Sequence, residues 1–273
     1  MFLCHFKVRI FLSQMQINSS LGIWTRRFVA ALFLGGQVIV HLIQGKIYRR
    51  NTLEQMAAVG PESLLIALIT AGFVGMVFTI QVSREFITLG AGNLAGGVLA
   101  LSLARELSPV LTAVIVTGRV GSAFAAEIGT MQVTEQIDAL YVLKTDPVDY
   151  LVIPRVIACC LMLPLLNIIC LITGLAGGLL ISSSLYNIPP NLFLESVQNF
   201  LTLWDLVSGE IKALVFGGVI AVISTNWGLT TTGGAKGVGQ STTTAVVTCL
   251  LSIFILDFFL SWSMFHGIGN SVL

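Results

Sequence analysis

Charged side chains are scarce in this sequence. Only 10% of its 273 residues are Asp, Glu, Lys or Arg, while 55% are hydrophobic. Soluble globular domains carry about 25% charged residues, because a polar shell must cover their core. The composition therefore excludes water as the main solvent and predicts a membrane protein. The net charge of +1 and the absence of a basic cluster beyond the N-terminal region also exclude a nucleic-acid partner.

The sequence also lacks the motifs of nucleotide hydrolysis. A phosphate-binding loop requires an early glycine, a Gly-Lys pair and a following Ser or Thr. Gly45-Lys46 lacks the first and the last of these, and Lys236 stands in the wrong place within Gly233–Gly239. No triad, paired-carboxylate or HExxH pattern supports other hydrolytic chemistry. We therefore expect a subunit that is not an enzyme, with energy supplied by another chain or by an ion gradient.

Metal-ligand spacing among the cysteines is missing as well. Most of the cysteines lie in or beside apolar stretches, where a cysteine usually packs as a small hydrophobic residue. The five are Cys4, Cys159, Cys160, Cys170 and Cys249. We expect no disulfide, no metal site and no cofactor.

Long apolar runs follow one another along the chain. About 20 helical residues cross the hydrocarbon core of a bilayer. The segments long enough are 62–83, 96–126, 150–182, 211–230 and 243–266. We therefore predict an all-α integral membrane protein with about five transmembrane helices. Residues 1–50 are expected to form an N-terminal segment, and residues 51–273 a single transmembrane domain.

A shorter apolar stretch, Phe28–Ile43, precedes these runs and carries Gln37 and His41. With Arg26 and Gln44 they form one polar stripe at helical spacing. Such a stripe on an apolar helix favours a helix that lies in the membrane interface. A first membrane span with a few polar residues is the alternative.

Lysine and arginine concentrate at the N-terminal end. Half of the 14 Lys and Arg residues lie within the first fifty positions. Because positive charge in short segments favours the cytoplasmic side, we expect the N-terminus on the cytoplasmic or stromal side of the membrane.

The second predicted span has a polar face. Its members follow three- and four-residue steps and fall within about 140° of one side of a regular helix. They are Arg105, Ser108, Thr112, Arg119, Ser122 and Glu127, with Glu106 beside them. An ionised side chain near the bilayer centre costs about 2.5–3.5 kcal/mol, so this face must meet protein or water. It predicts either a polar lining or gate of a translocation path, or a network of ion pairs between helices.

Two further features concern helix packing. Asp257 lies in the last predicted span without a basic neighbour in the sequence, and Arg105 or Lys212 is its expected partner. Small residues let membrane helices approach closely. In the second span the expected packing glycines are Gly118, Gly121 and Gly129.

The segment Thr130–Thr145, between the second and third spans, is too polar to enter the membrane. Ile137 and Leu140 share one helical face, while Glu135 and Asp138 lie on another. This pattern predicts a short amphipathic helix that serves as a docking element at the inner surface. Anchoring to the membrane surface alone is the alternative, which two acidic residues disfavour on anionic lipid.

Two long runs resemble the signatures of the MlaE permease family. The first, Arg105–Leu140, reads RELSPVLTAVIVTGRVGSAFAAEIGTMQVTEQIDAL, and the second, Gly233–Val247, reads GGAKGVGQSTTTAVV. The similarity extends from about Gly60 to the C-terminus. The resemblance implies an ABC transporter permease that works as a homodimer and moves phospholipid or related lipid between membranes. Its implied partners are a cytoplasmic ABC ATPase subunit, a second copy of itself, an MCE-domain lipid-binding protein and membrane lipids.

The same resemblance implies places for the interfacial helix and the coupling helix. The N-terminal amphipathic helix matches the family's interfacial helix, and the docking segment matches the helix that fits a groove on the ATPase. The candidate coupling residues are Val133, Thr134, Glu135, Gln136, Ile137, Asp138, Ala139 and Leu140. Family members occupy bacterial inner membranes, and a plastid envelope membrane is a further expected location.

Two alternatives to an ATP-driven permease remain at this point. One is a secondary transporter in which Asp257, Glu106 and Arg119 relay ions or protons. The other is a membrane scaffold that only anchors an MCE-type protein. The docking helix favours the ATP-driven permease, because a secondary transporter does not need one.

Overall fold

The computed structural model describes residues 20–44 and 48–266. Throughout this part of the chain the regular secondary structure is helical. In the described residues, five stretches are long and apolar enough to cross a membrane, namely Arg49–Thr88, Gly92–Val133, Val148–Leu185, Leu203–Leu229 and Gly234–Phe265. The predicted all-α fold with about five transmembrane helices is confirmed, and the chain is a multi-pass membrane protein.

The first crossing consists of α3 (Arg49–Val59) and α4 (Pro61–Thr88), which meet at Gly60. The third consists of the π-helical turn η4 (Val148–Val152) and α9 (Ile153–Leu185). Helices α11 (Leu203–Leu229) and α12 (Gly234–His266) form the fourth and fifth.

The second crossing is the most irregular of the five. It runs through the 3-10 turn η1 (Gly92–Leu94), α5 (Ala95–Ser102), η2 (Leu103–Leu107), α6 (Ser108–Val116), η3 (Thr117–Gly121) and α7 (Ser122–Val133). The turns η2 and η3 are π-helical. Because a π turn bonds residue i to i+5, it rotates everything after it relative to a regular helix. A face drawn at 100° per residue therefore does not stay on one side of this span.

Several helices extend beyond the predicted apolar runs. Helix α11 begins at Leu203 and not near residue 211, because Thr202 and Asp205 form a reciprocal capping box at its start. Helix α12 begins at Gly234, so most of the expected 231–242 loop is helical. Hydropathy marks the part of a helix that lipid surrounds, whereas caps set where the helix begins.

The helix α2 (Ser20–Gln44) lies across the bundle and contacts α11. Its apolar part, Arg27–His41, is too short to count among the membrane-crossing stretches. Ala31, Leu34 and Val38 are buried against the protein, while Leu32 is 65% exposed. The exposed side of α2 is thus apolar, as an interfacial helix in contact with lipid requires.

Helices α4 and α9 approach each other closely through glycine. A Cβ atom added to Gly75 would collide with the backbone of Gly174, and one added to Gly177 would lie 2.5 Å from the carbonyl oxygen of Gly72. Close backbone approach at small residues is the main source of attraction between helices in lipid. This contact fixes the first crossing against the third.

The predicted packing glycines of the second span behave differently from one another. A Cβ on Gly121 would lie 3.0 Å from Ser224 Oγ, and one on Gly129 would lie 3.1 Å from Thr231 Oγ1, so both face α11 and the turn after it. Gly118 is exposed, and a Cβ there would meet nothing within 4 Å. Among the described residues Gly118 thus has no packing neighbour at its Cβ position, and its expected packing role stays a prediction.

Candidate functional site

The connection between the second and third crossings contains a short helix, α8 (Gln136–Val142). Glu135 before it and Lys144 after it adopt left-handed backbone conformations, with φ of 60° and 57°. Ile137 is the buried anchor and packs with Ile128 of α7 and Leu151 of η4. A seven-residue helix has little stability alone, so this anchor and the two sharp turns hold it in place.

The predicted coupling segment began too early. Val133 is the last residue of α7, Thr134 caps that helix, and Glu135 forms the break before α8. Only Gln136, Ile137, Asp138, Ala139 and Leu140 of the predicted set lie on α8 itself. The break escaped prediction because a left-handed turn usually has Gly or Asn, and here a glutamate adopts it.

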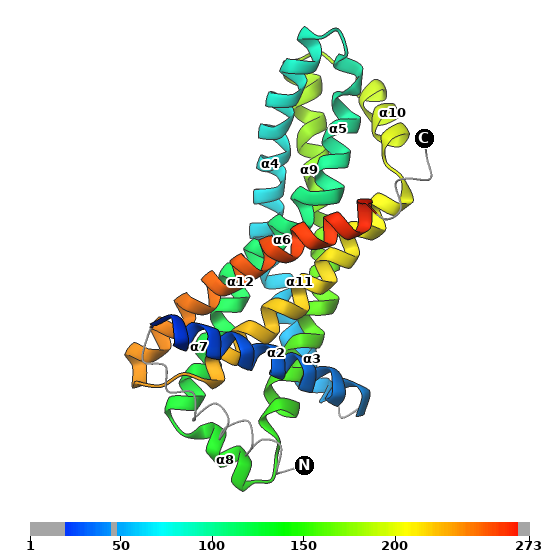
Figure 1. Ribbon diagram of the computed structural model, residues 1–273. Helices are drawn as coiled ribbons and strands as arrows, with labels where there is room; N and C mark the ends of the chain where they lie inside the picture. The colour runs from blue at the N-terminus through cyan, green and yellow to red at the C-terminus, as the bar shows by residue number, and fades with distance from the viewer. Residues whose placement is uncertain (1–19, 45–47, 267–273) are drawn as a thin grey trace.

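The C-terminal end of α8 and the turn after it expose apolar side chains, next to the exposed polar residues Gln136 and Asp138 at the start of the helix. Tyr141 is 43% exposed, Val142 82% and Leu143 72%. Helix α8 lies at one end of the molecule, and α10 (Pro190–Phe200) lies at the other (Figure 1). Exposed apolar residues on a short helix outside the membrane-crossing part typically mark a surface that a partner covers.

The centre of the bundle contains a buried lysine. The side chain of Lys212 on α11 is 0% exposed, and its Nζ lies 2.9 Å from Glu106 Oε2 and 2.9 Å from Asp257 Oδ1. Lys212 Nζ also donates to Ser261 Oγ at 2.6 Å and to the backbone oxygen of Arg105 at 2.8 Å. Lys212 is therefore the partner of Asp257, one of the two expected, and the cluster joins the second, fourth and fifth crossings.

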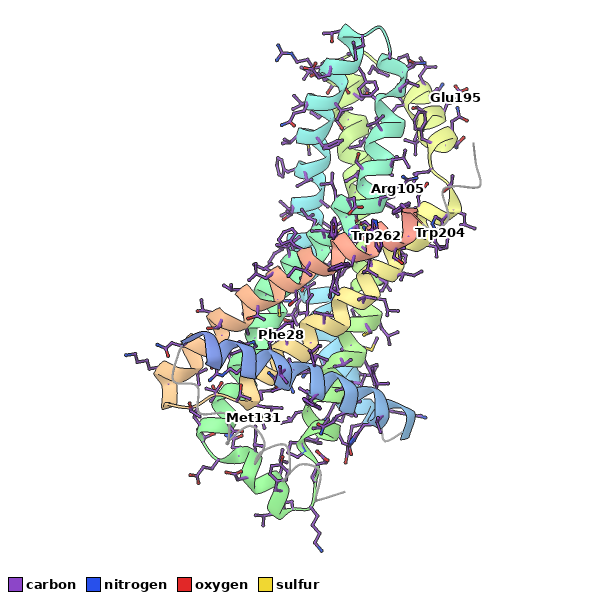
Figure 2. All side chains as sticks on the ribbon, in the orientation of Figure 1. Phe28, Arg105, Met131, Glu195, Trp204 and Trp262 are labelled. Atoms are coloured by element: carbon purple, nitrogen blue, oxygen red, sulfur yellow. The ribbon has the colours of Figure 1, made fainter. Side chains whose placement is uncertain are left out.

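Arg105 pairs with Asp205 of α11 and not with Asp257. Its Nε donates to Asp205 Oδ1 at 2.7 Å, and its guanidinium lies 4.6 Å from the ring centroid of Phe265. Figure 2 shows Arg105 beside the end of α12 that carries Phe265. Asp205 is 1% exposed and also caps the N-terminus of α11, so one carboxylate serves both the helix start and the ion pair.

The remaining charged residues of the second span contact other helices. Arg119 donates to Ser63 Oγ at 2.8 Å and pairs with Glu62 at 2.5 Å, both at the start of α4. Glu127 accepts from Arg155 of α9 at 2.8 Å. The residues of the predicted polar face thus contact all four other crossings, through α4, α9, α11 and α12.

The hydroxyl residues of this face bond to protein groups as well. Ser108 Oγ donates to Asn167 Oδ1 at 2.6 Å, and Asn167 Nδ2 donates to Glu210 at 2.8 Å. Thr112 and Ser122 donate to carbonyl oxygens one turn earlier. Of the two interpretations of this face, the contacts favour the network between helices; a role in a translocation path stays a prediction.

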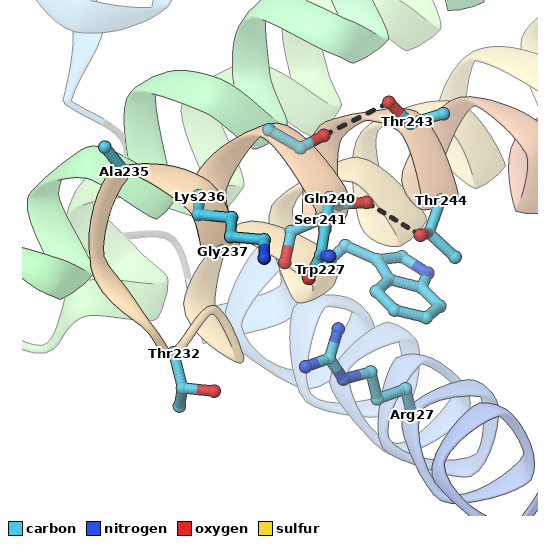
Figure 3. A pocket seen from close by; sticks show the side chains of 11 residues that line it. Arg27, Trp227, Thr232, Ala235, Lys236, Gly237, Gln240, Ser241, Thr243 and Thr244 are labelled. Carbon is cyan, nitrogen blue, oxygen red and sulfur yellow. Dashed lines mark hydrogen bonds between the residues drawn. The ribbon is translucent and has the colours of Figure 1, made fainter. Parts of the chain in front are cut away.

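A pocket of about 860 Å³ lies between α2, the end of α11 and the start of α12. Figure 3 shows Arg27 of α2 and Lys236 of α12 at this pocket, with Arg27 Cζ 4.6 Å from the ring centroid of Trp227. Arg27 also donates to the backbone oxygen of Thr230 at 3.3 Å. Sequence reasoning missed these residues, although much of the lining falls within the second family-like run.

These features define a class of protein: a multi-pass helical membrane protein, with charges buried between its crossings and a short helix at one end. A family model described as Permease MlaE matches residues 52–263. The chain belongs to the MlaE permease family.

Several curated proteins are similar over nearly the whole chain. A probable ABC transporter permease protein of Synechocystis sp. is 70% identical over 254 residues, which are 93% of this chain and 97% of that protein. The chloroplastic protein TRIGALACTOSYLDIACYLGLYCEROL 1 of Arabidopsis thaliana is 54% identical over 250 residues, 92% of this chain and 71% of that protein. A probable ABC transporter permease protein of Pyropia yezoensis is 48% identical over 249 residues, 91% of this chain and 95% of that protein.

Proposed function

We propose that this chain is the permease subunit of an ABC transporter that moves phospholipid or a related lipid between membranes, driven by a separate ATPase subunit. The observation that carries the proposal is α8, a short helix anchored by buried Ile137 and exposing Tyr141, Val142 and Leu143 at one end of the molecule. An apolar surface at the end of a short rigid helix suits a groove on a partner protein. The relatives named as ABC transporter permeases support the same reading.

The orientation and assembly follow from this proposal. The α8 end faces the cytoplasm or stroma, where ATP is available, and the α10 end faces an MCE-domain lipid-binding protein on the other side. A second copy of the chain completes the permease, and the open face at Gly118 is a candidate for that contact. The cyanobacterial and chloroplastic relatives favour a bacterial inner membrane or a plastid envelope membrane as the location.

The test introduces a charge on α8. Val142→Asp places a carboxylate at an exposed apolar position, where docking would desolvate it. We expect co-purification of the ATPase to fall about ten-fold or more, the usual size of a hot-spot loss. Leu89→Asp is the matched control, because Leu89 is 78% exposed in the turn between α4 and α5 at the opposite end. Both variants should elute from size exclusion like the parent chain.

Each outcome separates the candidate functions. Unchanged ATPase binding by Val142→Asp would overturn the assignment of α8 as the docking helix. Lipid transfer between vesicles that proceeds without ATPase and nucleotide would favour a secondary transporter. Binding of an MCE protein without any lipid transfer would favour a scaffold.

A further inference from the structure

Three potential metal ligands from distant parts of the chain meet beside α8. His41 comes from α2, Asp149 from η4, and Asp146 from the turn that precedes η4. His41 Nδ1 lies 2.5 Å from Asp149 Oδ1, and the two side chains are only 14% and 15% exposed. One ligand atom from each of the three residues lies within 4.8 Å of the others. Small side-chain movements would bring the three atoms to the distances that ligands of one ion need.

The charges of this cluster do not balance by themselves. Two carboxylates share a partly buried site, and within residues 20–44 and 48–266 neither Asp146 nor Asp149 forms an ion pair with a lysine or arginine. One oxygen of each carboxylate lies within 4.8 Å of the other, and like charges at this distance repel each other. A neutral His41 offsets neither charge, and a protonated one offsets a single charge. A divalent cation between the three side chains would offset both.

The backbone orients the two carboxylates before any ion arrives. Asp146 Oδ1 accepts from the backbone N–H of Val148 at 2.9 Å, and Asp146 O accepts from the N–H of Tyr150 at 3.1 Å. Between them, Pro147 fixes φ at −60°. The carboxylate of Asp146 is thus held at one oxygen, and its second oxygen remains for a ligand. Asp149 follows one helical turn later, so both side chains project to the same side.

We propose that His41, Asp146 and Asp149 bind a divalent transition-metal ion of the Zn²⁺ type, which ties α2 to the start of α9. Imidazole nitrogen with carboxylate oxygen is a donor set that Zn²⁺ accepts readily, whereas Mg²⁺ and Ca²⁺ prefer oxygen alone. Three protein ligands leave a further coordination position for water. The expectation of no metal site rested on cysteine spacing and could not anticipate ligands 108 positions apart.

The test measures Zn²⁺ binding to the full-length chain in detergent. All cysteines are alkylated first, because thiols also bind Zn²⁺. Metal is removed with a chelator, and Zn²⁺ is returned in competition with a chromophoric indicator. We expect one tight equivalent per chain. His41→Gln and Asp146→Asn remove a ligand while keeping polarity and size, and each should weaken Zn²⁺ binding about ten-fold or more.

A matched carboxylate variant and a second measurement guard against misfolding. Glu195→Gln changes an exposed carboxylate on α10 at the far end and should leave the affinity unchanged. Zn²⁺ should raise the melting temperature of the parent chain and of Glu195→Gln, because a ligand that binds only the folded state stabilises it. His41→Gln and Asp146→Asn should melt at the same temperature with and without Zn²⁺. Equal affinity in all four proteins, or no tight equivalent in the parent chain, would overturn the proposal.

Discussion

The buried lysine of α11 provides the sharpest test of how this bundle is held together. Lys212→Met keeps most of the apolar stem but removes the charge that faces Glu106 and Asp257. Removing one partner of a buried ion pair costs about 3–5 kcal/mol, because the remaining charge is left without compensation. Glu106 is 44% exposed and can regain water, whereas Asp257 is 18% exposed. We therefore expect a loss near the low end, about 3 kcal/mol.

The loss should appear as a lower melting temperature. For chains of 150–250 residues, about 1 kcal/mol corresponds to roughly 2–4 °C, so Lys212→Met should melt about 6–12 °C below the parent chain. Cys159 and Cys249 are 0% exposed in the folded bundle. A thiol-reactive fluorophore therefore reports unfolding when these two side chains become accessible.

Two comparisons isolate the electrostatic cause. Lys236→Met removes an exposed lysine from α12 and should change stability by less than about 0.5 kcal/mol. The triple variant Lys212→Met, Glu106→Gln and Asp257→Asn removes all three charges and should recover most of the loss. If the triple variant melts as low as the single variant, or if Lys212→Met melts with the parent chain, uncompensated charge is not the determinant of stability here.

Two further predictions concern helix ends and helix contacts. Thr202→Ala removes one cap hydrogen bond of α11 and should lower the free energy of unfolding by about 1 kcal/mol. Asp205→Ala also removes the partner of Arg105 and should lower it by about 3 kcal/mol. Equal melting temperatures for the two variants would contradict this order. Gly75→Ala should cost about 1–3 kcal/mol because the added methyl collides with the backbone of α9. Gly36→Ala on α2 meets open space and should be neutral or stabilising by at most about 1 kcal/mol. Thermal unfolding of both variants in detergent checks the sign.

The crossings and the main buried pair were predictable because lipid imposes strong constraints on sequence. A run of apolar residues long enough to cross hydrocarbon has few other uses, so all five crossings could be placed from hydropathy. An acid in such a run needs a partner, and that requirement pointed Asp257 toward Arg105 or Lys212, of which the structure shows Lys212.

The details that depend on backbone geometry could not be predicted in the same way. The π turns at 103–107 and 117–121 contain residues that fit a regular helix equally well, and only packing decides between the two. For this reason the expected single polar face was shared among several helices, and Gly118 turned outward. The left-handed conformation of Glu135 likewise makes α8 begin at Gln136, and no glycine in the sequence indicates this break.

The sequence did not indicate that the three residues of the candidate metal site lie together. His41 belonged to the polar stripe of the N-terminal helix, and Asp146 stands directly before Pro147 in the sequence. Neither pattern says that the two segments meet, because α2 reaches η4 only through the folded arrangement of the bundle. Contacts between distant segments need either a structure or covarying sequences.

The stiffness of α8 determines where a mechanical load applied to it would travel. The residues that flank it, Glu135 and Lys144, have left-handed backbone conformations. Its buried side chain, Ile137, packs with Ile128 and Leu151. Because α8 joins α7 to η4, a force on its exposed surface would act on the second and third crossings together. One movement of α8 would then displace both crossings.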